Sequence, residues 1–107
     1  MIKNYVFRLW QDGGNQPPAI TVKDSSLSGP VVWERISVGV YKGTLAGEFD
    51  PEHLWRGAPS FEPNFMGNEQ RIVLSSNIDA LFVFVTDSSG SPIDGCDMYA
   101  EVRLYIP

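Results

Sequence analysis

The chain has 107 residues, of which 43% are hydrophobic and 20% are charged, a composition typical of one small globular domain and not of a disordered segment. Eight Lys and Arg against thirteen Asp and Glu give a formal net charge of −5, which argues against nucleic acid or an anionic membrane surface as the main partner. One cysteine and one histidine exclude an internal disulfide and a multi-histidine metal site.

Residues 2–10 alternate between apolar and polar side chains and predict a first strand, with Tyr5, Phe7 and Leu9 on one face. This segment does not resemble a secretory signal, because Arg8 interrupts its apolar residues and no small-residue cleavage site follows. No apolar stretch approaches the roughly 18 residues of a membrane-spanning helix. We therefore expect no signal peptide or transmembrane segment, a protein made in a cytoplasm, and no membrane partner.

Gly, Asn and Pro residues gather over residues 11–18 and end the first strand, and residues 19–23 predict a short second one. The clearest pattern is a hairpin, in which residues 31–36 and 40–46 both alternate between apolar and polar side chains. Gly39, in the turn between them, can adopt the positive φ that a tight hairpin requires.

Residues 47–67 break this alternation. Asp50 is followed by Pro51, an arrangement typical of the first turn of a helix, so a helical turn over residues 51–55 is expected. Nearby glycine and proline residues exclude anything longer, namely Gly57, Pro59 and Pro63. Connections of about twenty residues are uncommon inside compact domains and are often functional. We therefore predict one irregular loop or short helical turn near 47–67.

Three further strands are predicted, over residues 71–75, 81–86 and 98–106. The inward face of the last strand is expected to consist of Met98, Ala100, Val102, Leu104 and Ile106. Six or seven short strands with almost no helix are typical of an antiparallel β-sandwich, with a small β-barrel as the alternative. No repeat or linker divides the chain, so residues 1–107 are expected to form a single β-sandwich domain.

The acidic residues of the last loop are the candidate metal ligands. Asp87, Asp94 and Asp97 supply carboxylate oxygens, which Ca²⁺ prefers, in a segment rich in Gly and Ser. The same residue types build ordinary hairpin connections, and their spacing does not match an EF-hand loop, so we predict a connection and leave calcium binding open. Cys96 precedes Asp97, whose charge raises the pKa of the thiol, and is expected to be a small buried or half-buried side chain.

Catalysis is not indicated by the sequence. No G-x-S-x-G motif is present, and His53 would be the only imidazole base available to a nucleophile. No glycine-rich phosphate loop precedes a helix, so no nucleotide is expected. We therefore expect no enzyme activity and no cofactor. A small hydrolase that uses Asp87 and Asp94 as its catalytic acids is the third of three hypotheses; the first two, a structural protein and a carbohydrate-binding module, are given below.

Three Trp, four Tyr and six Phe residues are a heavy aromatic load for this length. Large aromatic side chains usually belong to cores, and we expect this of Trp10 and Trp33. Trp55 differs, because it lies in the segment without alternation, among apolar residues that could cover the end of the sandwich or equally dock on a neighbouring subunit. The predicted interface residues are Phe49, Leu54, Trp55, Phe61, Phe65 and Met66. Alternatively, exposed rings of Trp10, Trp55 or Tyr99 form a platform for sugar rings.

The most distinctive stretch is Gly29–Leu45, with the sequence GPVVWERISVGVYKGTL. Together with SPIDG at residues 91–95 and the final strand AEVRLYIP, it resembles small β-proteins encoded among the structural genes of tailed phages and prophages. The resemblance spans the whole chain, but its motifs are turn glycines and core aromatic residues and carry no catalytic residue. Residues 47–67 depart most from the pattern.

This resemblance implies a virion-associated role, such as a capsid decoration, head-fibre or tail accessory subunit. Our leading hypothesis is therefore a non-enzymatic structural or assembly protein that works as a homo-oligomer and contacts other virion proteins. The alternative is a carbohydrate-binding β-sandwich module, whose partner is a glycan.

Overall fold

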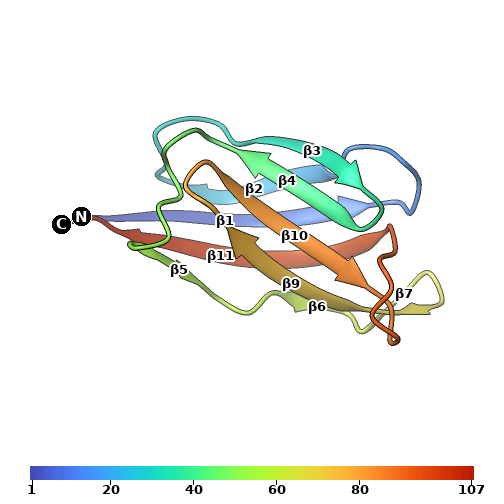
Figure 1. The fold of residues 1–107 in the computed structure, drawn as a ribbon. Helices are drawn as coiled ribbons and strands as arrows, with labels where there is room; N and C mark the ends of the chain where they lie inside the picture. Colours follow the sequence, from blue (N-terminus) through green and yellow to red (C-terminus); the bar gives the residue numbers. More distant parts are fainter.

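Two antiparallel β-sheets face each other in the computed structural model, which describes residues 1–107 (Figure 1). The first sheet consists, in spatial order, of β2 (Ala19–Ser25), β1 (Ile2–Gln11), β11 (Cys96–Tyr105) and β5 (Leu54–Arg56), with β6 (Ser60–Phe61) also paired to β11. The second sheet consists of β3 (Val32–Ser37), β4 (Val40–Thr44), β10 (Ala80–Thr86) and β9 (Arg71–Ser76). A separate hairpin consists of β7 (Asn64–Phe65) and β8 (Asn68–Glu69). Neither sheet closes into a barrel, so the predicted β-sandwich is confirmed and the barrel alternative is wrong.

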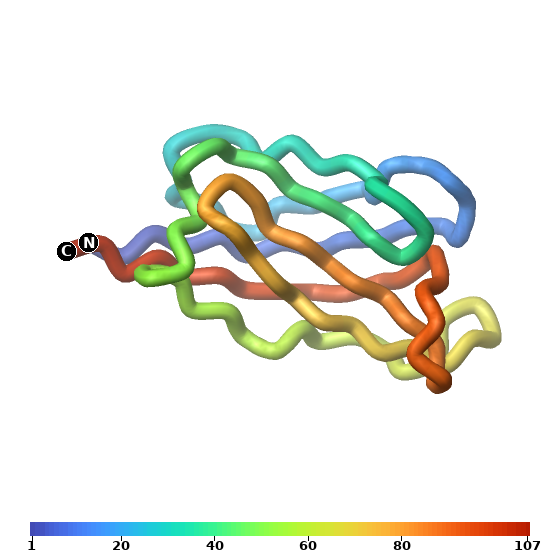
Figure 2. The backbone as a smooth tube through the Cα atoms, in the orientation of Figure 1, coloured from blue at the N-terminus to red at the C-terminus, as the bar shows by residue number.

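Strands β1 and β11 form the centre of the first sheet and pair antiparallel over all ten residues of each. Both alternate between inward and outward side chains, and the predicted inward residues are buried: Tyr5, Phe7, Leu9, Met98, Ala100, Val102 and Leu104. Ile106 lies beyond the end of β11 and is only half-buried. The pairing places the two chain ends side by side, where the Met1 amino group donates a hydrogen bond to the Ile106 carbonyl at 3.0 Å (Figure 2).

The core lies between the two sheets. The inner face of the second sheet contributes Tyr41, Ile72, Leu74, Leu81, Val83 and Val85 to a cluster of 14 buried residues. Phe49, from the connection between the sheets, is fully enclosed in the same cluster. Each such large apolar side chain contributes about 1.5–3 kcal/mol when it leaves water, so this cluster is the main source of stability.

The predicted hairpin of β3 and β4 packs through an aromatic residue and a glycine. Trp33 is half-buried against the core, and its indole N–H donates to the Tyr5 hydroxyl of the first sheet at 3.0 Å. Gly43 lies opposite Trp33, where an added Cβ would be 2.6 Å from the indole ring. The lack of a side chain at this position therefore makes room for the ring that connects the two sheets.

The predicted helical turn over residues 51–55 is wrong. A hydrogen bond from the His53 N–H to the Asp50 carbonyl (3.0 Å) closes one turn, and the chain then extends into β5. The open edge of β11 explains this outcome, because its N–H and C=O groups offer an extended segment more partners than a lone turn offers. Residues 54–69 therefore hold four short strands, β5 to β8, where an irregular loop was expected.

The carboxylate of Asp94 connects the β3–β4 hairpin to the segment that precedes β11. Arg35 Nη2 donates to Oδ2 at 2.8 Å, and the Gly39 N–H and the Tyr41 hydroxyl donate to Oδ1 at 3.0 and 2.9 Å. The Tyr41 hydroxyl in turn accepts the N–H of Gly95 at 3.1 Å. Because the Asp94 side chain is only 10% exposed, water competes little with these charge-assisted hydrogen bonds.

These donors also set the protonation of Asp94. Burial alone would raise the pKa of its carboxyl group, but hydrogen bonds from Arg35, Gly39 and Tyr41 outweigh burial and hold the pKa below its ordinary value. The contribution of Asp94 to stability is therefore complete above the pKa of the unfolded chain, about 3.9, and is lost as the pH falls through the lower pKa of the folded state.

Gly39→Ala is expected to destabilise the protein by at least about 2 kcal/mol, because φ is 69° and an added Cβ would overlap the Val85 carbonyl oxygen and lie 2.7 Å from the Ile93 carbonyl oxygen. Gly47→Ala is the matched control, since Gly47 has φ 74° but no atom within 4 Å of the added Cβ, and about 1 kcal/mol is expected there. Urea unfolding measures both. Equal losses would show that the packing around Gly39 is not the constraint described.

Asp94→Asn is expected to cost about 3 kcal/mol at neutral pH, because it leaves the Arg35 guanidinium half-buried without its counter-charge. The unfolding free energies of the variant and the original protein should converge as the pH is lowered from about 6 to 2, since protonation removes the same interaction. Asp24→Asn, on the exposed strand β2, is the control and should cost far less than Asp94→Asn at neutral pH, because Asp24 takes part in no ion pair. A constant difference across this pH range would contradict the assignment.

Candidate functional site

The six predicted interface residues do not form one surface. Phe49 is 0% exposed and cannot contact a partner, which corrects its assignment; it is buried because it fills the core between the sheets. Leu54, Phe61 and Phe65 are half-buried, whereas Trp55 is 45% and Met66 69% exposed. Trp55 lies on β5, and Met66 lies in the turn between β7 and β8, at the opposite end of the molecule (Figure 1).

The three carboxylates of the last loop do not converge. Asp87 accepts hydrogen bonds from the Ser89 and Ser91 N–H groups, as expected of a hairpin connection. Asp94 forms the connection to Arg35 described above, and Asp97 forms a bidentate ion pair with Arg8, with both distances 2.8 Å. Each carboxylate is thus used in a different part of the fold, and the structure brings no calcium ligand set together here.

Cys96 is fully buried at the start of β11. Burial, together with the nearby charges of Asp97 and Asp94, raises the pKa of the thiol to about 12. A thiol with this pKa and no exposed surface is not a nucleophile at neutral pH, so the expectation of a small buried side chain is confirmed.

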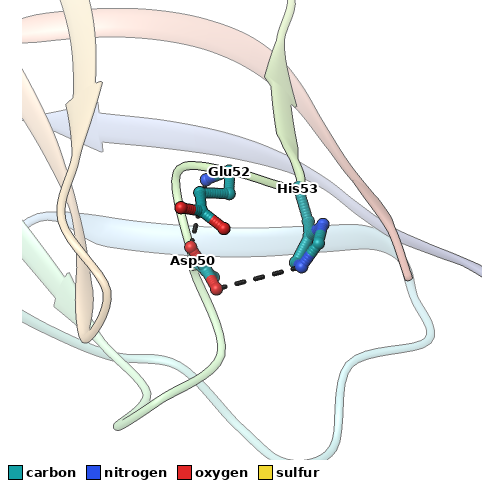
Figure 3. Close-up of side chains that lie close together, drawn as sticks. All are labelled: Asp50, Glu52 and His53. Atoms are coloured by element: carbon teal, nitrogen blue, oxygen red, sulfur yellow. Dashed lines mark hydrogen bonds and ion pairs between the residues drawn. The ribbon is translucent and has the colours of Figure 1, made fainter. Parts of the chain in front are cut away.

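One group of potential metal ligands does come together. Oxygen and nitrogen atoms of Asp50, Glu52 and His53 lie within 4.8 Å of one another in the turn before β5 (Figure 3). Asp50 Oδ2 is 4.0 Å from His53 Nε2, and Asp50 Oδ1 already accepts the Glu52 N–H at 3.0 Å. The carboxylate thus stabilises the turn, and all three side chains reach solvent. From its sequence, this D-P-E-H segment was expected to form only a short helical turn.

A shallow concave surface lies on the outer face of the first sheet, where its edge is interrupted. Strand β5 pairs with residues 102–104 of β11, and β6 pairs with residues 98–99. Residues 57–59 between them leave the edge of β11, and only the Gly57 N–H remains bonded, to the Glu101 carbonyl at 3.1 Å. A depression of about 400 Å³ occupies this interruption.

Two aromatic side chains line this depression, Trp55 from β5 and Tyr99 from β11, and each is 45% exposed. Small and apolar residues, including Val6 and Ala58, make up most of the remaining lining, and Ser60 and Glu101 add a hydroxyl and a carboxylate. We call this surface the Trp55–Tyr99 groove. Trp10 lies on the same sheet and is 41% exposed rather than in the core, but it does not line the groove.

Ion pairs hold both rings from one side. The Arg103 guanidinium lies 5.0 Å from the centre of the Trp55 ring and pairs with Glu101 at 2.8 Å. The Arg8 guanidinium lies 5.8 Å from the centre of the Tyr99 ring and pairs with Asp97. Cation–π contacts of this kind contribute about 0.5–1 kcal/mol each at exposed sites. Each ring therefore has an arginine of an ion pair over one face.

A second surface exposes apolar side chains on the second sheet. Val73 (59% exposed) and Phe84 (37%) are paired directly on β9 and β10, and Ile36 (49%) is exposed on β3, which is separated from β10 by β4. The rings of Phe82 and Phe84 stack at 6.1 Å between centres, and Lys42 lies 5.9 Å from the Phe82 ring centre. We call this surface the Phe84 face. Exposed apolar side chains that gather on one face often mark protein contacts.

Comparisons of the chain with family models, with curated proteins and with solved structures found no match. The resemblance to phage structural proteins therefore stays a prediction. The structure contains no helix with the length and apolar character needed to cross a membrane. The two surfaces described above are the candidate binding sites of the protein.

Proposed function

We propose that the protein is a non-enzymatic binding module that recognises carbohydrate in the Trp55–Tyr99 groove. One observation carries this proposal: two half-exposed aromatic rings line the same depression on a sheet face. Pyranose rings present flat patches of C–H groups, which pack against aromatic faces, and their hydroxyls require hydrogen-bond partners at the rim. Ser60 and Glu101 supply such groups, and a volume of about 400 Å³ falls in the range of small-molecule sites.

The chemistry of the groove supports binding over catalysis. Glycoside hydrolysis requires two carboxyl groups on either side of the scissile bond. Glu101 of this depression is already paired with Arg103, and Asp97 of the smaller depression beside it is paired with Arg8. Glu62 is then the one carboxylate without an ion pair, and no histidine or cysteine lines either depression. Recognition without turnover is therefore the activity that these residues fit best.

Assembly in a virion is a second candidate function, and the Phe84 face favours it. Exposed Val73, Phe84 and Ile36 would leave water if this face packed against another subunit. Such a role agrees with the resemblance to phage structural proteins and with a homo-oligomer that contacts other virion proteins. In this second candidate the contact is made through the Phe84 face and not through the predicted Phe49–Met66 segment.

Trp55→Ala and Tyr99→Ala are each expected to lower affinity for a bound glycan by at least about tenfold, or 1.4 kcal/mol, because each removes an aromatic surface of the groove. Tryptophan fluorescence titration against neutral, amino and acidic oligosaccharides identifies the ligand and measures its affinity. Trp10→Ala is the matched control, because Trp10 is similarly exposed but lies outside the groove. Equal losses in all three variants would place the site elsewhere, and the absence of binding to every sugar would refute the proposal.

The assembly function predicts a solution mass of several subunits that does not change on dilution, as measured by light scattering after size exclusion. Phe84→Asp is expected to shift this mass to that of the monomer, because a carboxylate cannot be buried unpaired in an apolar contact. Val22→Asp, on the exposed strand β2 of the other sheet, is the control. A monomeric mass for the unmodified protein would contradict the assembly function without affecting the groove.

A further inference from the structure

The Trp55–Tyr99 groove does not end at Tyr99. A second depression of about 230 Å³ lies on the other side of this ring, lined by Phe61, Glu62 and Asp97. Ser60 and Tyr99 line both depressions, so the two are compartments of one groove with the Tyr99 ring between them. The first compartment contains Trp55, and the second contains Glu62.

The spacing of the strand residues sets the length of a ligand that fills both compartments. The end of the Trp55 ring lies 3.2 Å from the position of an added Cβ on Gly57, and the Gly57 N–H bonds the Glu101 carbonyl, so the ring reaches the level of Glu101 on β11. Tyr99 is two residues and Asp97 four residues from Glu101 along this strand. At a rise of about 3.3 Å per residue, these separations are about 7 and 13 Å along the strand. A single sugar ring cannot span this distance, whereas a short linear chain can.

Charges in the groove discriminate against anionic ligands. The two cations that contact the aromatic rings of the groove, Arg103 and Arg8, are already paired with Glu101 and Asp97 at 2.8 Å. The Arg56 side chain, next to Trp55 in the chain, donates a hydrogen bond to Ser76 of the second sheet at 2.9 Å. Glu62 is exposed in the second compartment and takes part in none of the five ion pairs of the structure. A carboxylate or sulfate on the ligand would therefore meet a free negative charge and no free positive one.

We propose, on the basis of the function proposed above, that the groove binds an uncharged linear oligosaccharide of at least two pyranose units, which extends from Trp55 past Tyr99 so that Glu62 accepts hydrogen bonds from its hydroxyls. Trp55 stacks against one unit in the first compartment. The Ser60 hydroxyl, which lines both compartments, is placed to bond the unit on either side of Tyr99.

Calorimetric titration with mono-, di- and tetrasaccharides of three β-1,4-linked series, made of glucose, mannose and N-acetylglucosamine, tests this proposal. In the series that binds, affinity is expected to rise at least about tenfold from the monosaccharide to the tetrasaccharide. Glu62→Gln should lower tetrasaccharide affinity at least threefold and leave the monosaccharide unaffected. Glu69→Gln, an exposed change on β8 outside both compartments, is the matched control.

A β-1,4-linked uronic acid tetramer of the same ring configuration, glucuronic for the glucose series or mannuronic for the mannose series, tests the charge argument and should bind at least about tenfold more weakly than the neutral tetramer. If the acidic tetramer binds as tightly as the neutral one, the two-compartment proposal is wrong. It is also wrong if the monosaccharide binds as tightly as the tetrasaccharide. In either case the carbohydrate function stands as long as Trp55→Ala still abolishes binding. If Glu62→Gln and Glu69→Gln have the same effect, the role of Glu62 is wrong. If no series binds, both this proposal and the proposed function fail.

Discussion

The hydrogen bonds around Asp94 decide how the two sheets are joined. Its carboxylate accepts hydrogen bonds from Arg35, Gly39 and Tyr41 of the β3–β4 hairpin, and Asp94 lies two residues before the first residue of β11. The chain therefore passes from β10 of the second sheet to β11 of the first sheet through a segment that is fixed against the β3–β4 hairpin. Because β11 pairs with β1, β5 and β6, its position determines the rest of the first sheet and the placement of Tyr99 on the outer face.

The groove is a consequence of incomplete pairing along β11. Two short strands cover parts of its edge, and the residues between them, Gly57 to Pro59, leave a gap that Trp55 and Tyr99 border. Proline lacks an N–H and cannot complete the ladder, and glycine leaves the Trp55 ring free to lie 3.2 Å from the position of a Cβ. Gly57 and Pro59, which exclude a long helix in the sequence, therefore interrupt the pairing along the edge of β11 between β5 and β6.

Sequence patterns predicted the long strands because alternation over five or more residues is a strong signal. They failed between residues 47 and 69, where strands of two or three residues have no measurable period and depend on the edge of β11 for their hydrogen bonds. Phe49 and Trp55 could not be distinguished there, although one is enclosed and the other exposed. The groove depends on the register in which β5 pairs with β11, and the role of Asp94 depends on Arg35, which lies 59 residues away in the sequence. Local sequence patterns contain no information about either contact.

The full-length pairing of β1 with β11 also has a consequence for how the chain reaches its native state. The first and last strands meet only after the intervening chain, residues 12–95, has been brought into place, which is a costly loop to close. Strands β4, β9 and β10 lie within residues 40–86 and can pair with far shorter loops. We therefore expect the second sheet to order early and the first sheet late, so that the surface carrying Trp55 and Tyr99 exists only once folding is complete.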